Sequence, residues 1–212
     1  MKKKFLVWDV DTQYDFMKPD GKLYVDGAEE IIDRVSEIRI FALKNGFPLI
    51  ASTDWHTRKD KEIEEEPDYK ETYPQHCMAG DPGAERVGQT GEMEIDIIEN
   101  REMDRKELKR ILSKDLFHAV IRKNATNVFT NPNTESMLDI IVPRNIIVFG
   151  VALDVCVYYT VLELMDRTGA SLRLIKDAVR AIDPEKGDDA MEAFAARGVR
   201  IQTFDEMKAA VL

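Results

Sequence analysis

The feature that most constrains the fold is a regular alternation between short apolar runs and longer amphipathic segments. The apolar runs have the length of buried strands, and they lie at residues 5–10, 48–52, 119–122, 146–150, 172–175 and 199–203. A helix between two strands carries the chain back across the sheet, so that the next strand lies parallel to its neighbour. The sequence therefore predicts an α/β fold, with a doubly wound, mostly parallel sheet and helices on both faces.

Four segments between the runs carry helical signals. Residues 28–44 have apolar side chains at helical spacing, and Asn45 and Gly46 follow as a C-terminal cap. Similar patterns occupy residues 133–141, 153–168 and 184–197. The last of these opens directly after an aspartate and has proline in its first turn, as helices often do. Each segment is predicted to be a helix.

The length of 212 residues fits one compact domain, residues 1–212. The stretch around residues 85–116 breaks the alternation. In it, residues 93–97 alternate apolar and polar side chains, and Asp104 with Glu107 has the spacing of a capping box. We expect this stretch to be an elaboration of the single domain that contains a short helix.

The charge balance bears on the partners of the protein. Thirty lysines and arginines against forty aspartates and glutamates give a net charge of -10, which argues against nucleic acid as a partner. The apolar run after Lys2 to Lys4 is too short for a signal peptide or a membrane span. Two distant cysteines suit free thiols in a reduced cytoplasmic protein. We expect a small-molecule substrate, and a homo-oligomer is possible.

Three reactive residues fall where predicted strands end. Asp11 follows the first run, Lys123 ends the third, and Cys156 lies in the first turn of a helix. Because the carboxyl ends of parallel strands meet at one edge, these side chains are expected to converge. A helix N-terminus and an ammonium would lower the pKa of a thiol, and a carboxylate could act as general base and acid. Taken singly, each residue also has an ordinary structural interpretation.

Two motifs carry a resemblance to a known family. One is Asp11-Thr-Gln13-Tyr-Asp15-Phe16, and the other runs over residues 150–157 as Gly-Val-Ala-Leu-Asp-Val-Cys-Val. Together they resemble the nicotinamidases and related cysteine hydrolases of the isochorismatase-like superfamily, and the resemblance covers nearly the whole chain. It implies the three-layer isochorismatase-like hydrolase fold.

The resemblance also assigns the catalytic roles. It implies a catalytic group of Asp11, Lys123 and Cys156, and its register selects Asp11 over Asp9 as the catalytic carboxylate. It further implies a cis peptide between Val151 and Ala152, and an oxyanion hole formed by the backbone N–H groups of Ala152 and Cys156.

The resemblance extends to a metal site. Asp54-Trp-His56 and Tyr73-Pro-Gln-His76-Cys, which hold two of the three histidines, are similar to the ligand motifs of metal-binding members. They imply a divalent cation, zinc, manganese or iron, held by Asp54, His56 and His76. Some members have another histidine where this chain has Glu62, which could complete the shell or belong to a solvated acidic face. We expect the substrate to contact four side chains: Phe16, Leu23, Tyr73 and Phe129.

The expected reaction is hydrolysis of nicotinamide to nicotinate and ammonia through a cysteine thioester, with a place in pyridine nucleotide salvage. One alternative is another small amide or carbamoyl compound. Isochorismate hydrolysis is disfavoured, because relatives with that activity lack the cysteine. A non-catalytic binding module is disfavoured by the intact catalytic group.

Overall fold

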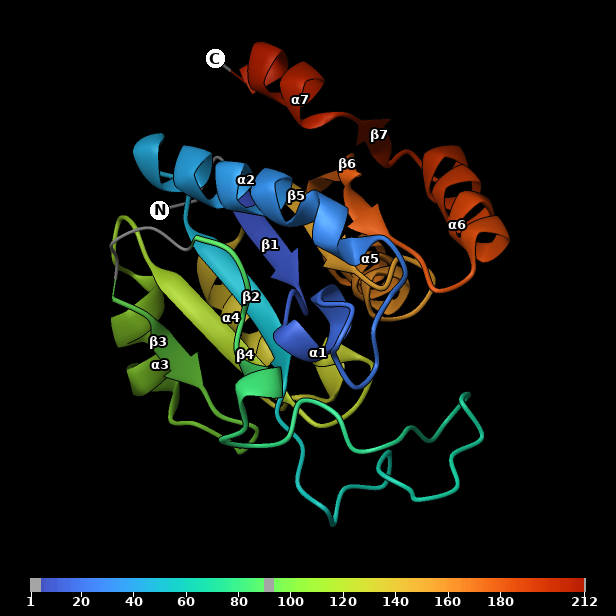
Figure 1. The fold of residues 1–212 in the computed structure, drawn as a ribbon. Coiled ribbons are helices and arrows are strands. Elements are labelled where there is room, and N and C mark those ends of the chain that lie inside the picture. Colours follow the sequence, from blue (N-terminus) through green and yellow to red (C-terminus); the bar gives the residue numbers. More distant parts are fainter. Residues whose placement is uncertain (1–4, 90–93, 212) are drawn as a thin grey trace.

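The computed structural model describes residues 5–89 and 94–211. Lys2 to Lys4, and Met93 of the predicted alternating run, lie outside these residues. The described chain builds a seven-stranded sheet in the order β3-β4-β2-β1-β5-β6-β7 (Figure 1). All neighbouring strands are parallel, as predicted. The strands are β1 (Leu6–Val10), β2 (Leu49–Asp54), β3 (Asp96–Ile98), β4 (His118–Lys123), β5 (Asn145–Val151), β6 (Ser171–Arg180) and β7 (Arg200–Gln202).

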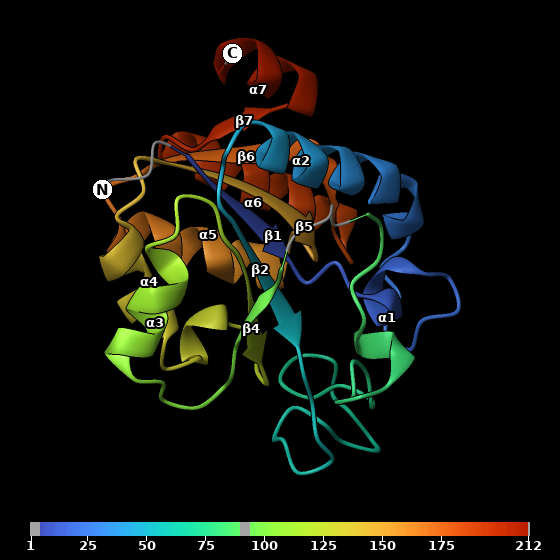
Figure 2. The same cartoon turned by 90° about the vertical axis from the view of Figure 1, so that its left-hand side faces the viewer.

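Helices cover both faces of the sheet (Figure 2). The α-helices are α1 (Tyr14–Met17), α2 (Ile32–Lys44), α3 (Arg105–Leu112), α4 (Thr134–Ile141), α5 (Cys156–Arg167), α6 (Pro184–Ala196) and α7 (Phe204–Val211), and the short 3-10 turns are η1 (Ala28–Ile31), η2 (Pro82–Ala84) and η3 (Val128–Thr130). Buried side chains of α2 and α7 pack against one face, and those of α3, α4, α5 and α6 pack against the other. The predicted three-layer α/β architecture is confirmed.

The predicted helices are present, and their ends follow local chemistry. Residues 28–44 begin as the 3-10 turn η1 before α2. The Asp183 side chain caps α6 by accepting from the Glu185 and Lys186 amides. The Asp104 side chain caps α3 through the Lys106 amide at 2.7 Å. The predicted helix 153–168 begins only at Cys156, because the preceding residues form a tight turn.

The stretch predicted as an elaboration contributes to the main sheet. Residues 96–98 form β3, which pairs in parallel with β4, and α3 follows. Two of the three β3 residues, Asp96 and Ile97, are only half-buried, so this edge strand lacks the apolar run that marks the other strands. The same stretch thus extends the sheet by one strand.

The site lies at the carboxyl ends of the four central strands, β4, β2, β1 and β5. Gly150 allows β5 to leave the sheet beside β1: its φ is +126°, and a Cβ there would lie 2.0 Å from the Val10 carbonyl oxygen. Only glycine fits this close approach. No helix among the described residues is both long and apolar enough to cross a membrane.

Candidate active site

The three residues expected to form the catalytic group are in contact. Lys123 Nζ lies 2.9 Å from Asp11 Oδ2 and 3.9 Å from Cys156 Sγ. All three side chains are buried. They come from the end of β4, the turn after β1 and the first residue of α5, so the parallel topology brings them together as predicted.

A second carboxylate completes the surroundings of Lys123. Asp54 is the direct neighbour of Lys123 across the β2–β4 pair, and Lys123 Nζ also donates to Asp54 Oδ1. Asp11 is held in turn by Ser52 Oγ, which donates to its Oδ1 at 2.6 Å. Burial alone would lower the pKa of Lys123, but Asp11 and Asp54 raise this pKa well above its ordinary value. The ammonium therefore stays charged.

The thiol environment differs from the sequence expectation. Burial raises the pKa of Cys156 well above its ordinary value; Lys123 opposes this shift, whereas Asp11 and Asp54 add to it. The lowering of the thiol pKa by the helix N-terminus and by Lys123 is smaller than the increase caused by burial and by the two carboxylates. Burial likewise raises the pKa of Asp11, with Lys123 opposing and Asp54 reinforcing. The resting thiol thus keeps its proton next to a carboxyl group suited to exchange it.

The turn before Cys156 has the expected backbone. The Val151–Ala152 peptide is cis. The Ala152 carbonyl accepts from the amides of Val155 and Val157, both at 3.0 Å, which closes the turn. The Cys156 amide belongs to the first turn of α5, where backbone N–H groups have no intrahelical acceptor.

Asp154 of the same motif ties this turn to the next loop. Its carboxylate oxygens accept from the amides of Ile182 at 2.9 Å and Asp183 at 3.0 Å. The motif aspartate therefore fixes the backbone around Cys156 from the β6–α6 side.

The predicted metal ligands cluster beside this group. One ligand atom each from Asp54, His56 and His76 lie within 4.8 Å of one another. Nε2 of His76 is 3.6 Å and Nε2 of His56 is 3.8 Å from Asp54 Oδ2. His76 Nδ1 donates to the Pro74 carbonyl at 2.8 Å, which leaves its Nε2 as the free acceptor.

The hydrogen bonding of His56 tests whether a cation fits. Both ring nitrogens of His56 are buried, and neither has a hydrogen-bond partner among the described residues. A buried imidazole nitrogen without a partner is costly unless something accepts its lone pair. Two imidazoles and one carboxylate suit a divalent cation, so the residues fit the expected metal.

Glu62 stands apart from these ligands. Its Oε1 accepts from the Thr126 amide at 2.7 Å and from Thr126 Oγ1 at 3.0 Å. It lines the same pocket but does not belong to the cluster of ligand atoms around Asp54. The geometry gives Glu62 a place in the pocket wall and lends no support to its tentative role as a ligand.

Two motif residues that the sequence analysis left without a role act on the backbone. Gln13 Nε2 donates to the carbonyls of Asp54 at 2.8 Å and Ala84 at 2.9 Å, and its Oε1 accepts from the Asp54 amide at 2.7 Å. Asp15 Oδ2 accepts from the Cys77 amide at 2.7 Å. The fixed spacing of these residues to Asp11 was the signal that could have identified them.

Asp9 is committed elsewhere. It pairs with Arg39 Nε at 2.7 Å and Arg86 Nη2 at 2.6 Å, and Thr12 Oγ1 donates to it at 2.8 Å. Burial would raise the pKa of Asp9, but the two arginines lower it. Asp11 is therefore the carboxylate that faces the thiol, in agreement with the predicted register.

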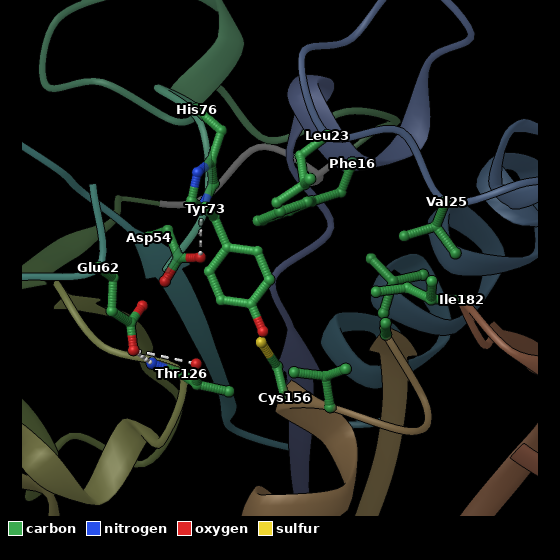
Figure 3. A pocket seen from close by; sticks show the side chains of 13 residues that line it. Phe16, Leu23, Val25, Asp54, Glu62, Tyr73, His76, Thr126, Cys156 and Ile182 are labelled. Carbon is green, nitrogen blue, oxygen red and sulfur yellow. Dashed lines mark hydrogen bonds and ion pairs between the residues drawn. The ribbon is translucent and has the colours of Figure 1, made fainter. Parts of the chain in front are cut away.

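A pocket opens above Cys156 and holds about 400 Å³ of empty space, part of it open to solvent. Phe16, Leu23 and Tyr73, three of the residues expected to contact the substrate, line it. Figure 3 shows Asp54 and His76 on one side of Cys156 and the aliphatic residues Val25 and Ile182 on the other. The lining residues that the sequence analysis missed lie in loops and at strand ends without periodic signals: Val25, Thr126, Val151, Val155 and Ile182.

Phe129, which was expected to contact the substrate, does not line this pocket. The 3-10 turn η3 turns its ring onto Trp8, with ring centroids 6.4 Å apart. The Arg167 guanidinium lies 5.3 Å from its ring centroid. Phe129 thus packs against the core under α5 and does not line the pocket.

Comparisons with known proteins agree with this geometry. The isochorismatase domain family matches residues 5–206. A pyrazinamidase of Pyrococcus horikoshii in complex with zinc is 26% identical over 95% of this chain and 99% of its own, with a TM-score of 0.76. The search of curated proteins gave no match.

Two further solved structures share the fold. The nicotinamidase from Bacillus subtilis is 20% identical over 94% of this chain and 99% of its own, with a TM-score of 0.73. The N-carbamoylsarcosine amidase from Thermoplasma acidophilum is 21% identical over 94% of this chain and 96% of its own, with a TM-score of 0.68. Since the domain match spans nearly all of a chain whose parallel sheet and strand-end residues have just been described, the chain belongs to the isochorismatase family of hydrolases.

Proposed function

We propose that the protein is a cysteine-dependent amidohydrolase that converts nicotinamide to nicotinate and ammonia. One observation carries the proposal: the Asp54 carboxylate joins the two clusters at the floor of one pocket. Its Oδ1 accepts from Lys123, which contacts Cys156, and its Oδ2 faces the imidazoles of the candidate metal site. The same pocket therefore offers a nucleophile and a separate recognition point.

In the first half-reaction, the Cys156 sulfur attacks the carboxamide carbon while its proton passes to Asp11. The backbone amides of Ala152 and Cys156 stabilise the oxyanion. The C–N bond then breaks, and Asp11 returns the proton to the departing nitrogen, which leaves as ammonia. Lys123 stays protonated throughout and offsets the negative charge that builds up beside Asp11.

In the second half-reaction, water attacks the Cys156 thioester. Asp11 takes a proton from this water, the C–S bond breaks, and the proton returns to the sulfur. The products are a carboxylic acid, which ionises, and the resting enzyme.

Asp54, His56 and His76 would hold a divalent cation: zinc, manganese or iron. When bound, this cation supplies a Lewis-acid position for the ring nitrogen of a pyridine carboxamide. Phe16 and Tyr73 line the pocket beside His76, with ring centroids 5.4 Å and 6.0 Å from the imidazole, and suit a flat aromatic ring. The zinc complex of the Pyrococcus horikoshii pyrazinamidase supports the choice of metal class.

A second candidate is another small amide or carbamoyl compound. It is favoured by the aliphatic part of the pocket wall, formed by Leu23, Val25 and Ile182, which offers surface to a non-aromatic acyl group.

Ammonia release from a substrate panel separates the two candidates. We expect nicotinamide and pyrazinamide to exceed benzamide in kcat/KM by about tenfold or more, because benzamide lacks the ring nitrogen and loses about 1.4 kcal/mol or more of recognition. If benzamide or an N-carbamoyl amino acid were the best substrate, the result would support the second candidate, hydrolysis of another small amide or carbamoyl compound.

A further inference from the structure

Asp60 lies on the far side of His56 from Asp54. Its Oδ2 is 3.7 Å from His56 Nδ1, while Nε2 of the same ring is 3.8 Å from Asp54 Oδ2. The His56 side chain is fully buried, and that of Asp60 is only 14% exposed. The imidazole is therefore enclosed between two carboxylates, one at each ring nitrogen.

The Asp60 carboxylate is fixed by groups other than His56. Its Oδ2 accepts from the Thr57 amide at 2.7 Å, and its Oδ1 accepts from Asn124 Nδ2 at 3.0 Å. Asn124 Oδ1 accepts in turn from Asn100 Nδ2 at 2.6 Å. Asn124 directly follows Lys123, so this chain of hydrogen bonds starts at the exit of β3, passes the end of β4 and ends at Asp60, whose Oδ2 lies 3.7 Å from His56 Nδ1.

A neutral imidazole has one N–H donor and one acceptor nitrogen, and the partner of one decides the role of the other. His76 shows the arrangement in full, since its Nδ1 donates to a backbone carbonyl and its Nε2 faces Asp54. His56 has the same orientation with a carboxylate in place of the carbonyl. The 3.7 Å separation exceeds a hydrogen bond by less than about 1 Å, and Asp60 Oδ2 is the carboxylate oxygen nearest to Nδ1 among the contacts of this ring.

We propose that Asp60 is a positioning residue for His56. It accepts the Nδ1 proton, fixes the tautomer and leaves the Nε2 lone pair directed at the space shared with Asp54 and His76. Carboxylates in this position orient metal-binding histidines and strengthen binding. The inference rests on the metal site of the proposed function and adds to it a residue outside the three ligands.

The test is the affinity for cobalt(II), measured on chelator-treated protein by competition with a coloured chelator and by the visible absorption of the bound ion. We expect Asp60→Ala to raise the cobalt Kd about 10- to 100-fold and to change the absorption spectrum. Asp60→Asn, whose amide oxygen can still accept from His56, should stay much closer to the original protein.

Asp68→Ala is the matched control. Asp68 lies in the same segment and accepts from three backbone amides, those of Lys70, Glu71 and Thr72, at 2.9 Å, but it belongs to a turn away from the imidazoles. An unchanged cobalt Kd in Asp60→Ala overturns the inference and leaves the metal site standing. Equal weakening in Asp60→Ala and Asp68→Ala also overturns it, since that result reports loop damage.

Asp60→Ser protects the test against misfolding. Its side chain stays polar but is one atom shorter, so no oxygen lies at the position of Oδ2, which faces both the Thr57 amide and His56 Nδ1. We expect the same loss of cobalt affinity as in Asp60→Ala, with circular dichroism reporting that the variant is folded. A cobalt Kd in Asp60→Ser equal to that of the original protein would overturn the inference. Failure of the unaltered protein to bind cobalt would overturn the metal site and this inference together.

Discussion

At the scale of single residues, two carboxylates and one ammonium govern the thiol. The Lys123 ammonium pairs with both Asp11 and Asp54. The negative charge of these two carboxylates offsets most of the effect of the ammonium on the pKa of Cys156. The raised pKa of the buried thiol means that the thiolate is not formed in advance. In the mechanism proposed above, the proton would therefore pass to Asp11 as the sulfur attacks, so activation of Cys156 would depend on substrate binding.

The first prediction concerns this nucleophile. Cys156→Ala should reduce amide hydrolysis by about 10⁵-fold or more, to the background rate, because no other group can form the thioester. Ammonia release and circular dichroism on the purified variant measure activity and folding together. Trapping of the acyl-enzyme, detected as a mass increase of the unaltered protein, should disappear.

Cys77→Ala is the control for Cys156→Ala. Cys77 is fully buried. Its backbone amide donates to Asp15, its carbonyl accepts from the His56 amide at 3.0 Å, and its sulfur makes only a weak contact to the Gly83 carbonyl at 3.7 Å. This variant should keep most of its turnover. Loss of activity in Cys77→Ala together with retention in a folded Cys156→Ala would reverse the assignment.

The second prediction concerns the metal ligands. His56→Ala should raise KM for nicotinamide by more than it lowers kcat. The reason is that the metal held by His56 is proposed to bind the pyridine ring and not the carbon that reacts. Removal of the metal with a chelator should have the same effect, and metal added back should restore KM only in the unaltered protein. Steady-state kinetics with parallel elemental analysis decide the matter, and full turnover in verified metal-free enzyme would contradict the role.

At the scale of elements, the close approach of the end of β5 to β1 requires a glycine at position 150. Gly150→Ala should destabilise the protein by about 3 kcal/mol or more, because the methyl group meets the Val10 carbonyl at a positive φ. Urea unfolding measures the loss. Gly169→Ala is the matched control: with nothing within 4 Å of the new Cβ, it should change stability by no more than about 0.5 kcal/mol. Equal effects of the two changes would refute the account.

The elements that sequence predicts well are those with long-range periodicity. Six of the seven strands in the described residues coincide with predicted apolar runs, and the central strands β1, β2, β4 and β5 are buried almost throughout. The edge strand β3 does not, since half-exposed positions such as Asp96 and Ile97 carry no such signal. The register of β6 against β5 shifts between Val148 and Gly150, and no local pattern marks that irregularity.

The candidate site divides in the same way. Asp11, Lys123 and Cys156 follow from the rule that parallel strands end at one edge, together with the motif spacing. Side chains that reach the pocket from loops, such as Thr126 and Ile182, depend on the path of the backbone and could not be predicted. Phe129, expected at the substrate, lies outside the pocket lining, since the path of the 3-10 turn η3 decides which way its ring points.

At the scale of the whole molecule, a buried cluster ties strands, helix and loop together. Asp9 of β1 pairs with Arg39 of α2 and with Arg86, whose Nη1 donates to Nε2 of His118 on β4 at 2.8 Å. Burial, with Arg86 adjacent, lowers the pKa of His118 to about 3 from an ordinary value of 6.5. His118 is therefore neutral in the folded protein.

A fourth prediction follows for stability against pH. Between pH 6.5 and about 3 the unfolded chain binds a proton at His118 and the folded protein does not, so stability should fall as pH is lowered through this window. The slope for this one group is at most about 1.4 kcal/mol per pH unit. The pKa of Asp9 is lowered in the folded protein, so protonation of Asp9 in the unfolded chain reduces stability only below about its ordinary pKa of 3.8.

Urea unfolding at a series of pH values measures this slope. In His118→Gln, the amide oxygen can still accept from Arg86. The free energy of unfolding of this variant should fall less steeply between about pH 6 and 4.5, because the unfolded chain no longer gains a proton at position 118. An identical pH profile in the two proteins would contradict the assignment of the proton to His118.

The pairing of Asp54 with Lys123 across β2 and β4 has a consequence for how such a chain can change over time. An insertion or deletion of one residue within either strand would turn one of these side chains to the opposite face and separate acid from amine. Residues 57–75, by contrast, form an extended arm beyond the sheet, visible in Figure 1, with a histidine at each flank. Length variation should therefore be tolerated less in the two strands than in those parts of the arm that do not line the pocket. Under the proposed function, such variation would alter the choice of substrate while the Asp54–Lys123 pair is kept.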